Sequence, residues 1–277
     1  MRRRKRSRCA ALELPVIKKT HLQDPSFQQP QDPGASVWRY IDVPRFVSML
    51  QNRGLYYARV DHLPDEYEGG WGECLEGTRL ADPVFGKLLK HGSWASRQMV
   101  RLYYVNCWRL QPGESDALWR IYTGGPSGGI AIRTTYRQLV EELPETDYIG
   151  EIQYLDYGSE AFDPHYIANF LMHKRLQFSH EREVRIVRTV ETASFQDQSV
   201  AEMRDRLPIG VDVPVDLSKV VQAVVVSPYA PEWHLELVRG LVKAHGFEFP
   251  VVLSEMARLP FTGSLFADVS YSLRLKP

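Results

Sequence analysis

The feature that most constrains the fold is a series of short segments rich in β-branched and aromatic residues, separated by turns and by amphipathic segments. Such segments are typical of β-strands, and the amphipathic segments between them are typical of α-helices. The sequence therefore predicts an α+β fold, with a mostly antiparallel split sheet and interspersed helices. The predicted strands cover residues 37–41, 55–60, 102–108, 129–132, 148–157, 183–190, 220–226 and 250–255.

The predicted helices lie between these strands. The clearest follows residue 41: Asp42 is a suitable N-cap, Pro44 suits a first turn, and Gly54 is expected to close the helix. Phe46, Met49 and Leu50 give it an apolar stripe. Further helices are predicted within residues 79–100, 117–122, 137–143, 165–178 and 227–247.

Composition limits the classes to which this protein can belong. The chain has 277 residues, 34 basic and 34 acidic side chains, and an apolar fraction of 44%, which is typical of a globular protein. No apolar run approaches the roughly 18 residues of a membrane helix, and residues 1–17 lack the core of a signal peptide. The three cysteines show neither a disulfide pattern nor zinc spacing. We therefore expect a cytoplasmic protein that holds no metal.

Charge is unevenly spread along the chain. Residues 1–19 carry many Arg and Lys side chains with Glu13 as their one acid, and residues 20–36 are rich in Pro, Gln and Asp. We expect residues 1–36 to form a disordered arm and linker, and residues 37–277 to form one α+β domain. Such an arm could contact nucleic acid, although a solvated leader is the simpler interpretation.

The segment FSHEREVRIV, residues 178–187, raises the question of function. In a strand, Glu181, Glu183 and Arg185 would point to the same face, and two carboxylates on one face repel each other. They could face a ligand, or they could form ion pairs with Arg182, Arg185 or Lys174. Paired carboxylates are also the catalytic groups of glycosidases, at a separation that the sequence does not give.

Two other polar groups are candidates for the same site. One is Trp38-Arg39-Tyr40, and the other is Glu114-Ser115 with Trp119 and Tyr122. For Arg39 the alternative is a surface ion pair, and for Trp119 and Tyr122 it is core packing.

Other chemistries find little support in the sequence. The segment of residues 124–129 is glycine-rich but lacks the ending of a phosphate-binding loop, so we interpret it as a hairpin turn. There is no GxSxG motif, the histidines are scattered, and Cys107 has the features of a packed thiol.

Taken in order, several motifs resemble an uncharacterised bacterial family, a domain of unknown function often found near phage-defence genes. The resemblance covers nearly all of residues 37–255. Its motifs are Trp38-Arg39-Tyr40, Asp65-x-x-Glu68-Gly69, Cys107-Trp108, Leu118-Trp119-x-x-Tyr122 and Lys174 followed by Phe178-x-x-Glu181-x-Glu183-Val184-Arg185.

A more distant resemblance is to DarT-type ADP-ribosyltransferases of bacterial toxin systems. Arg39 stands where that family has a His, and the Glu181-x-Glu183 strand is similar to the strand that holds the family's catalytic Glu. The resemblance implies an ADP-ribosyltransferase-like fold and a transferase that cleaves NAD and modifies nucleic acid or protein, in an antiviral defence or toxin–antitoxin locus with a possible partner protein. Glu183 and Glu181 would be catalytic. The residues implied to bind NAD are Arg39, Tyr40, Ser115, Trp119, Tyr122 and Tyr104.

The chemistry of this reaction suits the assignment. Cleavage of the bond between ribose and nicotinamide develops positive charge on the ribose, which a carboxylate would stabilise. An NAD glycohydrolase would use the same site with water as the acceptor. The alternative from another class is a non-enzymatic sensor or toxin-neutralising module with a decayed nucleotide cleft. A nuclease is third, because the sequence lacks an acidic metal cluster.

Overall fold

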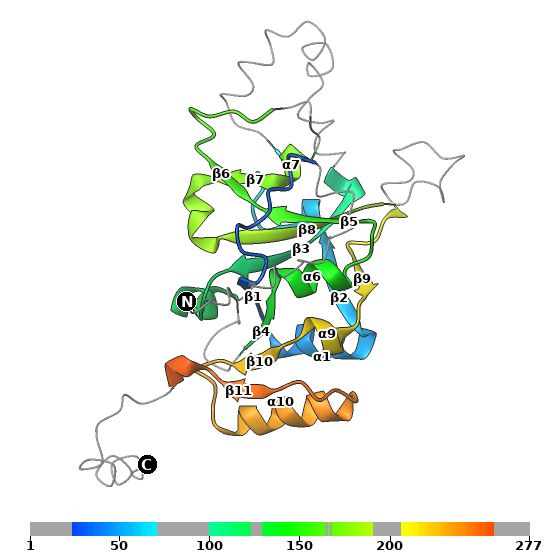
Figure 1. Cartoon of the computed structure of the whole chain (residues 1–277), viewed down its shortest axis with the longest axis vertical. Helices are drawn as coiled ribbons and strands as arrows, with labels where there is room; N and C mark the ends of the chain where they lie inside the picture. The colour runs from blue at the N-terminus through cyan, green and yellow to red at the C-terminus, as the bar shows by residue number, and fades with distance from the viewer. Residues whose placement is uncertain are drawn as a thin grey trace, which may run out of the picture.

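A computed structural model of the chain describes residues 24–70, 100–122, 129–163, 166, 168–190 and 206–257. Within these residues the fold is α+β, and one mixed sheet of nine strands dominates it (Figure 1). All its strand pairs are antiparallel except β10 with β11. Along the main path the strands are β11 (Val251–Leu253), β10 (Ala223–Val226), β4 (Ile130–Thr135), β1 (Ser36–Ile41), β3 (Tyr103–Leu110), β2 (Gly54–Arg59) and β9 (Gly210–Pro214).

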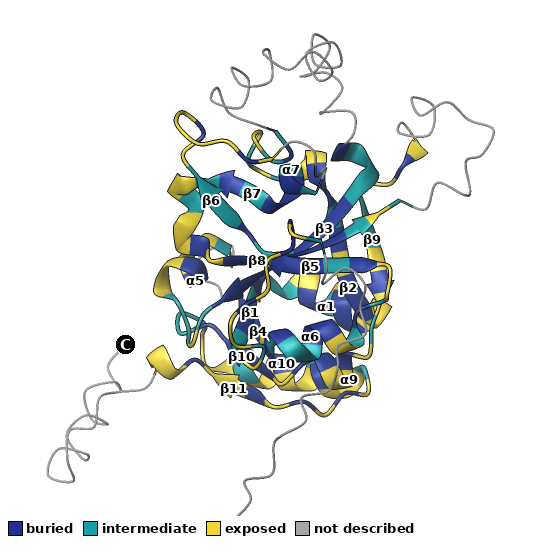
Figure 2. Cartoon of the chain, turned by 45° about the horizontal axis from the view of Figure 1, so that its top comes forward, coloured by how far each residue is buried: buried dark blue, intermediate teal, exposed yellow. Residues whose placement is uncertain are grey.

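The sheet branches at β3. On one edge, β1 pairs with the C-terminal end of β3 through Trp38 and Arg109, and β2 pairs with its N-terminal end through Arg59 and Tyr104. The other edge of β3 pairs along its length with β8 (Glu183–Thr189), and β8 pairs in turn with β5 (Asp147–Glu151). Strand β3 is therefore the centre of the sheet, and it is largely buried (Figure 2).

The two faces of the sheet are covered differently. The larger core lies on the face to which Val37 and Ile41 point, and it includes apolar side chains from α1 (Val43–Asn52), α6 (Tyr136–Glu142), α9 (Leu217–Val220) and α10 (Trp233–Ala244). We call this the helical face. Trp38 and Tyr40 point to the opposite face, where they pack with residues of α5 (Asp116–Tyr122). We call this second face the α5 face.

The predicted helix after residue 41 is confirmed as α1. The Asp42 side chain accepts a hydrogen bond from the backbone N of Arg45 at 2.8 Å, and Phe46, Met49 and Leu50 are buried. Its end differs from the prediction, because Arg53 adopts the left-handed conformation (φ 50°) and Gly54 begins β2. The glycine at position 54 is therefore needed not to end the helix but because β9 lies close to it. A Cβ there would lie 2.4 Å from the carbonyl oxygen of Val213 on β9.

The predicted helix over residues 165–178 is wrong. The chain forms one helical turn, α7 (Asn169–Met172), then the strand β7 (His173–Arg175), and then the 3-10 helix η4 (Leu176–Glu181). Strand β7 pairs in parallel with β6 (Gln153–Leu155), so the predicted strand over 148–157 is also divided, into β5 and β6. Glu181 lies in η4 rather than in a strand.

The packed chain begins before Val37, contrary to the predicted boundary. The side chain of Phe27 is buried, and the carbonyl oxygen of Gln28 accepts a hydrogen bond from the backbone N of Glu151 at 2.8 Å. The predictions for residues 1–19, for most of the helical region 79–100 and for the turn at 124–129 concern segments outside the described residues, except Val100 in η3 (Val100–Leu102) and Gly129. In the described part of the chain, no helix has the length and apolar character that a membrane crossing requires.

Candidate functional site: a buried charge cluster

Glu181 and Glu183 lie in a compact group of six charged side chains, which we call the charge cluster. None of the six side chains is more than 9% exposed. The group contains as many carboxylates as cations. Its members are Glu68, Glu181, Glu183, Arg109, Lys174 and Arg185.

Strand register brings most of the cluster together on the α5 face. Arg109 of β3 is opposite Glu183 of β8, and Cys107 is opposite Arg185, so these side chains share one face. Lys174 reaches them from β7, where it is buried. Arg182 adopts the left-handed conformation (φ 43°) between η4 and β8, and both neighbouring glutamates still reach the cluster.

Glu183 is surrounded by cations. Its Oε1 accepts a hydrogen bond from Nε of Arg185 at 2.7 Å, and its Oε2 lies 3.4 Å from Nζ of Lys174 and 3.6 Å from Nη1 of Arg109. Burial alone would raise the pKa of Glu183, but Arg185, Arg109 and Lys174 together hold that pKa well below its ordinary value. Glu183 is therefore a carboxylate whose charge is already compensated.

Glu181 is held in a similar way at the edge of the cluster. Its Oε2 accepts a hydrogen bond from Nζ of Lys174 at 2.8 Å and lies 3.5 Å from Nη2 of Arg109. Its Oε1 accepts a hydrogen bond from the hydroxyl of Tyr122, which itself accepts one from Arg109 at 2.6 Å. Burial is the main cause that raises the pKa of Tyr122 to about 12, so its hydroxyl is protonated.

Four members of the cluster were not predicted site residues. Lys174 and Arg185 were expected only as possible ion-pair partners, and Glu68 and Arg109 had no predicted role at the site. Glu68 binds Arg185 through two parallel contacts of 2.8 and 3.1 Å, and it also lies 3.2 Å from Lys174. The acidic loop motif Asp65-x-x-Glu68-Gly69 was the sequence signal for Glu68. Arg109 follows Trp108 in β3, and only the pairing with β8 identifies its role.

Three of the predicted NAD-binding residues pack beside the cluster rather than around an open site. Tyr40 and Trp119 are buried and meet edge to face with ring centroids 4.9 Å apart. The hydroxyl of Tyr40 accepts a hydrogen bond from the backbone N of Ser115 at 3.0 Å, and the Ser115 hydroxyl accepts one from the backbone N of Leu118 at 3.4 Å. These contacts fix the start of α5 on the sheet.

Arg39 and Tyr104 lie on the helical face, away from the two glutamates. Trp38 is paired with Arg109, and Arg109 with Glu183, so Trp38 shares the face of Glu183 and Arg39 points to the opposite one. The expectation that Arg39 belongs to the same site as Glu181 and Glu183 is therefore wrong.

Each of these two residues has its own partner on the helical face. Arg39 donates to the carbonyl oxygen of Tyr56 at 3.3 Å, and burial lowers its pKa to about 10. The Tyr104 hydroxyl donates to the carbonyl oxygen of Pro208 at 2.9 Å.

Within the described ranges, no group of His, Cys, Asp and Glu side chains is arranged to hold a metal ion. No protein-family model, no curated protein and no solved structure matches this chain. The geometry of the chain itself is thus the basis for a functional assignment.

Proposed function

We propose that this chain is a non-enzymatic module that senses a small ligand, and that Glu181 and Glu183 serve its fold. The observation that carries the non-enzymatic part of the proposal is the charge balance of the cluster. Each carboxylate oxygen of Glu68, Glu181 and Glu183 has a protein donor or cation as its partner. A carboxylate that stabilises a cationic ribose must face the substrate with its charge uncompensated. Glu181 and Glu183 are instead at most 5% exposed and lie against cations of the protein.

The experiment that tests this proposal compares NAD consumption with stability. Wild-type protein is incubated with labelled NAD and cell extract, and both nicotinamide release and transfer of label are followed. We expect neither. Glu183→Gln should lower the free energy of unfolding by about 3 kcal/mol, because it leaves buried cations without their counter-charge.

Glu236→Gln is the matched control, because Glu236 pairs with Arg239 on the surface and its side chain is 72% exposed. It should change the free energy of unfolding by less than about 1 kcal/mol. Catalytic consumption of NAD by the wild type would overturn the proposal, and its loss in a normally stable Glu183→Gln variant would assign catalysis to Glu183.

One observation favours a second candidate, an ADP-ribosyltransferase or NAD glycohydrolase that acts at the edge of the cluster. Tyr122 is only partly buried, and it connects Glu181 to Arg109 at the end of α5. An aromatic ring and a carboxylate side by side could hold a nicotinamide ribose if the contact between them opened. For this candidate, Tyr122→Phe and Glu181→Gln should each reduce NAD turnover, with label transferred to nucleic acid or protein in the transferase case.

A further inference from the structure

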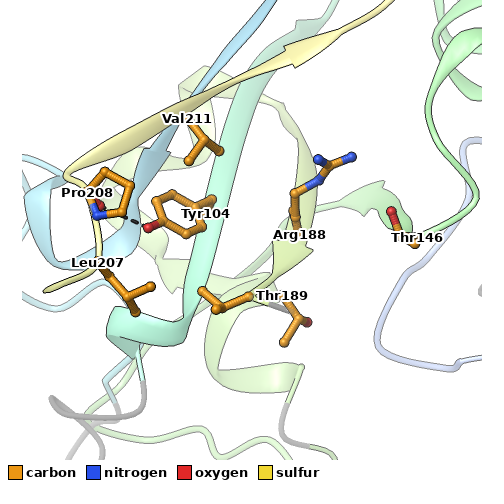
Figure 3. Close-up of a pocket in the computed structure, with 8 residues that line it drawn as sticks. Tyr104, Thr146, Arg188, Thr189, Leu207, Pro208 and Val211 are labelled. Atoms are coloured by element: carbon orange, nitrogen blue, oxygen red, sulfur yellow. Dashed lines mark hydrogen bonds between the residues drawn. The ribbon is translucent and has the colours of Figure 1, made fainter. Parts of the chain in front are cut away.

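A small pocket lies on the helical face, on the other side of the sheet from the charge cluster. Its volume is about 240 Å³. Tyr104, Val211 and Leu207 line one side of it, and Arg188 extends between Tyr104 and Thr146 (Figure 3). The lining is thus mostly apolar with one cation.

The guanidinium of Arg188 is held in place by the buried side chain of Asp147. Its Nε donates to Oδ1 of Asp147 at 2.6 Å, and Asp147 is 1% exposed. The other carboxylate oxygen of Asp147 accepts a hydrogen bond from the hydroxyl of Tyr57 at 2.7 Å. Asp147 therefore fixes the guanidinium through one nitrogen. The two terminal nitrogens of Arg188 make no hydrogen bond to the part of the chain that the structure describes, and the side chain is 25% exposed.

The apolar side of the pocket is also held in place. Nη1 of Arg59 donates to the carbonyl oxygen of Leu207 at 2.6 Å, and the Tyr104 hydroxyl donates to that of Pro208 at 2.9 Å. These bonds place the chain before β9 against β2 and β3. The pocket is thus built from fixed elements on both sides, as in a preformed ligand site.

We propose that this pocket binds a small organic carboxylate with an apolar body. The guanidinium is fixed at Nε, and its two terminal nitrogens make no hydrogen bond to the described residues, so they match the two oxygens of a carboxylate. The apolar lining matches the remainder of such a ligand. Asp147 already balances the charge of Arg188, so a singly charged carboxylate fits better than a phosphate dianion. This inference rests on the proposed sensor function, for which it names the class of ligand.

The test uses benzoate as the probe, with benzamide and inorganic phosphate as comparisons, and follows binding to the full chain by ligand-observed NMR and calorimetry. We expect benzoate to bind with a Kd of about 1 mM or tighter. Benzamide, which lacks the charge, and phosphate, which lacks the apolar body, should each bind at least about tenfold more weakly. Wild-type protein that binds no benzoate, or that binds phosphate as tightly as benzoate, would overturn the proposal.

Two variants test the residues, each with its own control. Val211→Phe places a larger side chain in the pocket while Arg188 itself is unchanged, and it should weaken benzoate binding at least about tenfold. Val252→Phe, at an exposed position of β11, should not. Arg188→Gln should remove the preference for benzoate over benzamide, whereas Arg45→Gln at an exposed site should keep it. Unchanged binding in Val211→Phe would refute the site. NAD turnover in the wild type would contradict the sensor function. The benzoate measurements would still show whether the pocket binds a carboxylate.

Discussion

At the residue scale, Glu183 shows how neighbours rather than solvent determine what a carboxylate can do. It is 2% exposed and would not be charged there alone, yet Arg185, Arg109 and Lys174 keep it ionised. The sequence predicted the pairing with Arg185 and Lys174 as one of two alternatives. It could not predict the contribution of Glu68 and Arg109, because they are distant in sequence and meet only through the loop and strand pairing.

The lowered pKa of Glu183 predicts a dependence of stability on pH. A carboxyl group whose pKa is lower in the folded state favours folding above its ordinary pKa, and this contribution is lost as the pH falls towards the folded value. Wild-type protein should therefore lose stability as the pH falls below 4.5, the ordinary pKa of a glutamate. Urea unfolding at several pH values should show a smaller loss for Glu183→Gln. An equal loss in both proteins would place the pH dependence elsewhere.

A second residue-scale prediction concerns charge balance. Glu68→Gln and Lys174→Gln should each lower the free energy of unfolding by about 3 kcal/mol, because each leaves the buried cluster with a net charge. The double variant restores neutrality, so its loss should be smaller than the sum by about 1–3 kcal/mol. Chemical denaturation of the four proteins measures this coupling. The exposed pair Glu236 and Arg239 is the control and should couple by less than about 1 kcal/mol.

At the element scale, the sequence predicted most strands and the capped helix α1 because local signals determine them. It missed β9 and α9, which are short and interrupted by polar residues and Pro214. The helix predicted over residues 165–178 failed because pairing with β6 and contacts of Lys174 with three carboxylates outweigh local helical preference.

Two glycines provide a test of element packing. Gly54→Ala would place a Cβ 2.4 Å from the Val213 carbonyl oxygen, so β2 and β9 must separate, and we expect a loss of about 2 kcal/mol. Gly240 lies in α10, and a Cβ added there would have no described atom within 4 Å apart from the neighbouring backbone of its own helix. Gly240→Ala should therefore stabilise the protein by about 1 kcal/mol through helix propensity. Thermal and urea unfolding of both variants check the two signs. Equal changes in the free energy of unfolding for the two variants would show that close contact with β9 does not restrict the side chain at position 54.

At the scale of the whole molecule, the predicted site residues lie on two different faces of the sheet, so they do not form one site. Tyr122 contacts Glu181 directly and Glu183 only through Arg109, whereas Arg39 and Tyr104 point to the other side of the sheet. The sequence gives the alternation within one strand, but a shift of pairing by one residue exchanges its faces. Register depends on contacts between distant segments, so the sequence alone could not predict it.

Truncation tests where the packed molecule begins. Removal of residues 1–30 deletes Phe27 and its contacts with the sheet, whereas removal of residues 1–19 does not. The longer deletion should cost about 3 kcal/mol relative to the shorter one, which corresponds to a melting temperature lower by about 6 °C for a chain of this length. Calorimetry of the two truncated proteins measures the difference. Equal melting temperatures would restore the boundary near Val37.

The position of β3 at the branch of the sheet has a consequence for synthesis on the ribosome. Strands β1 and β2 leave the ribosome before β3 and can pair with it early, but β8 follows some distance later in the chain. Until β8 emerges, one edge of β3 is unpaired, and Arg109 has neither Glu181 nor Glu183 beside it. An exposed strand edge is a hazard for association with other chains. The nascent protein is thus most vulnerable to aggregation between the emergence of β3 and the emergence of β8 from the ribosome, and slower elongation in that interval would extend the period.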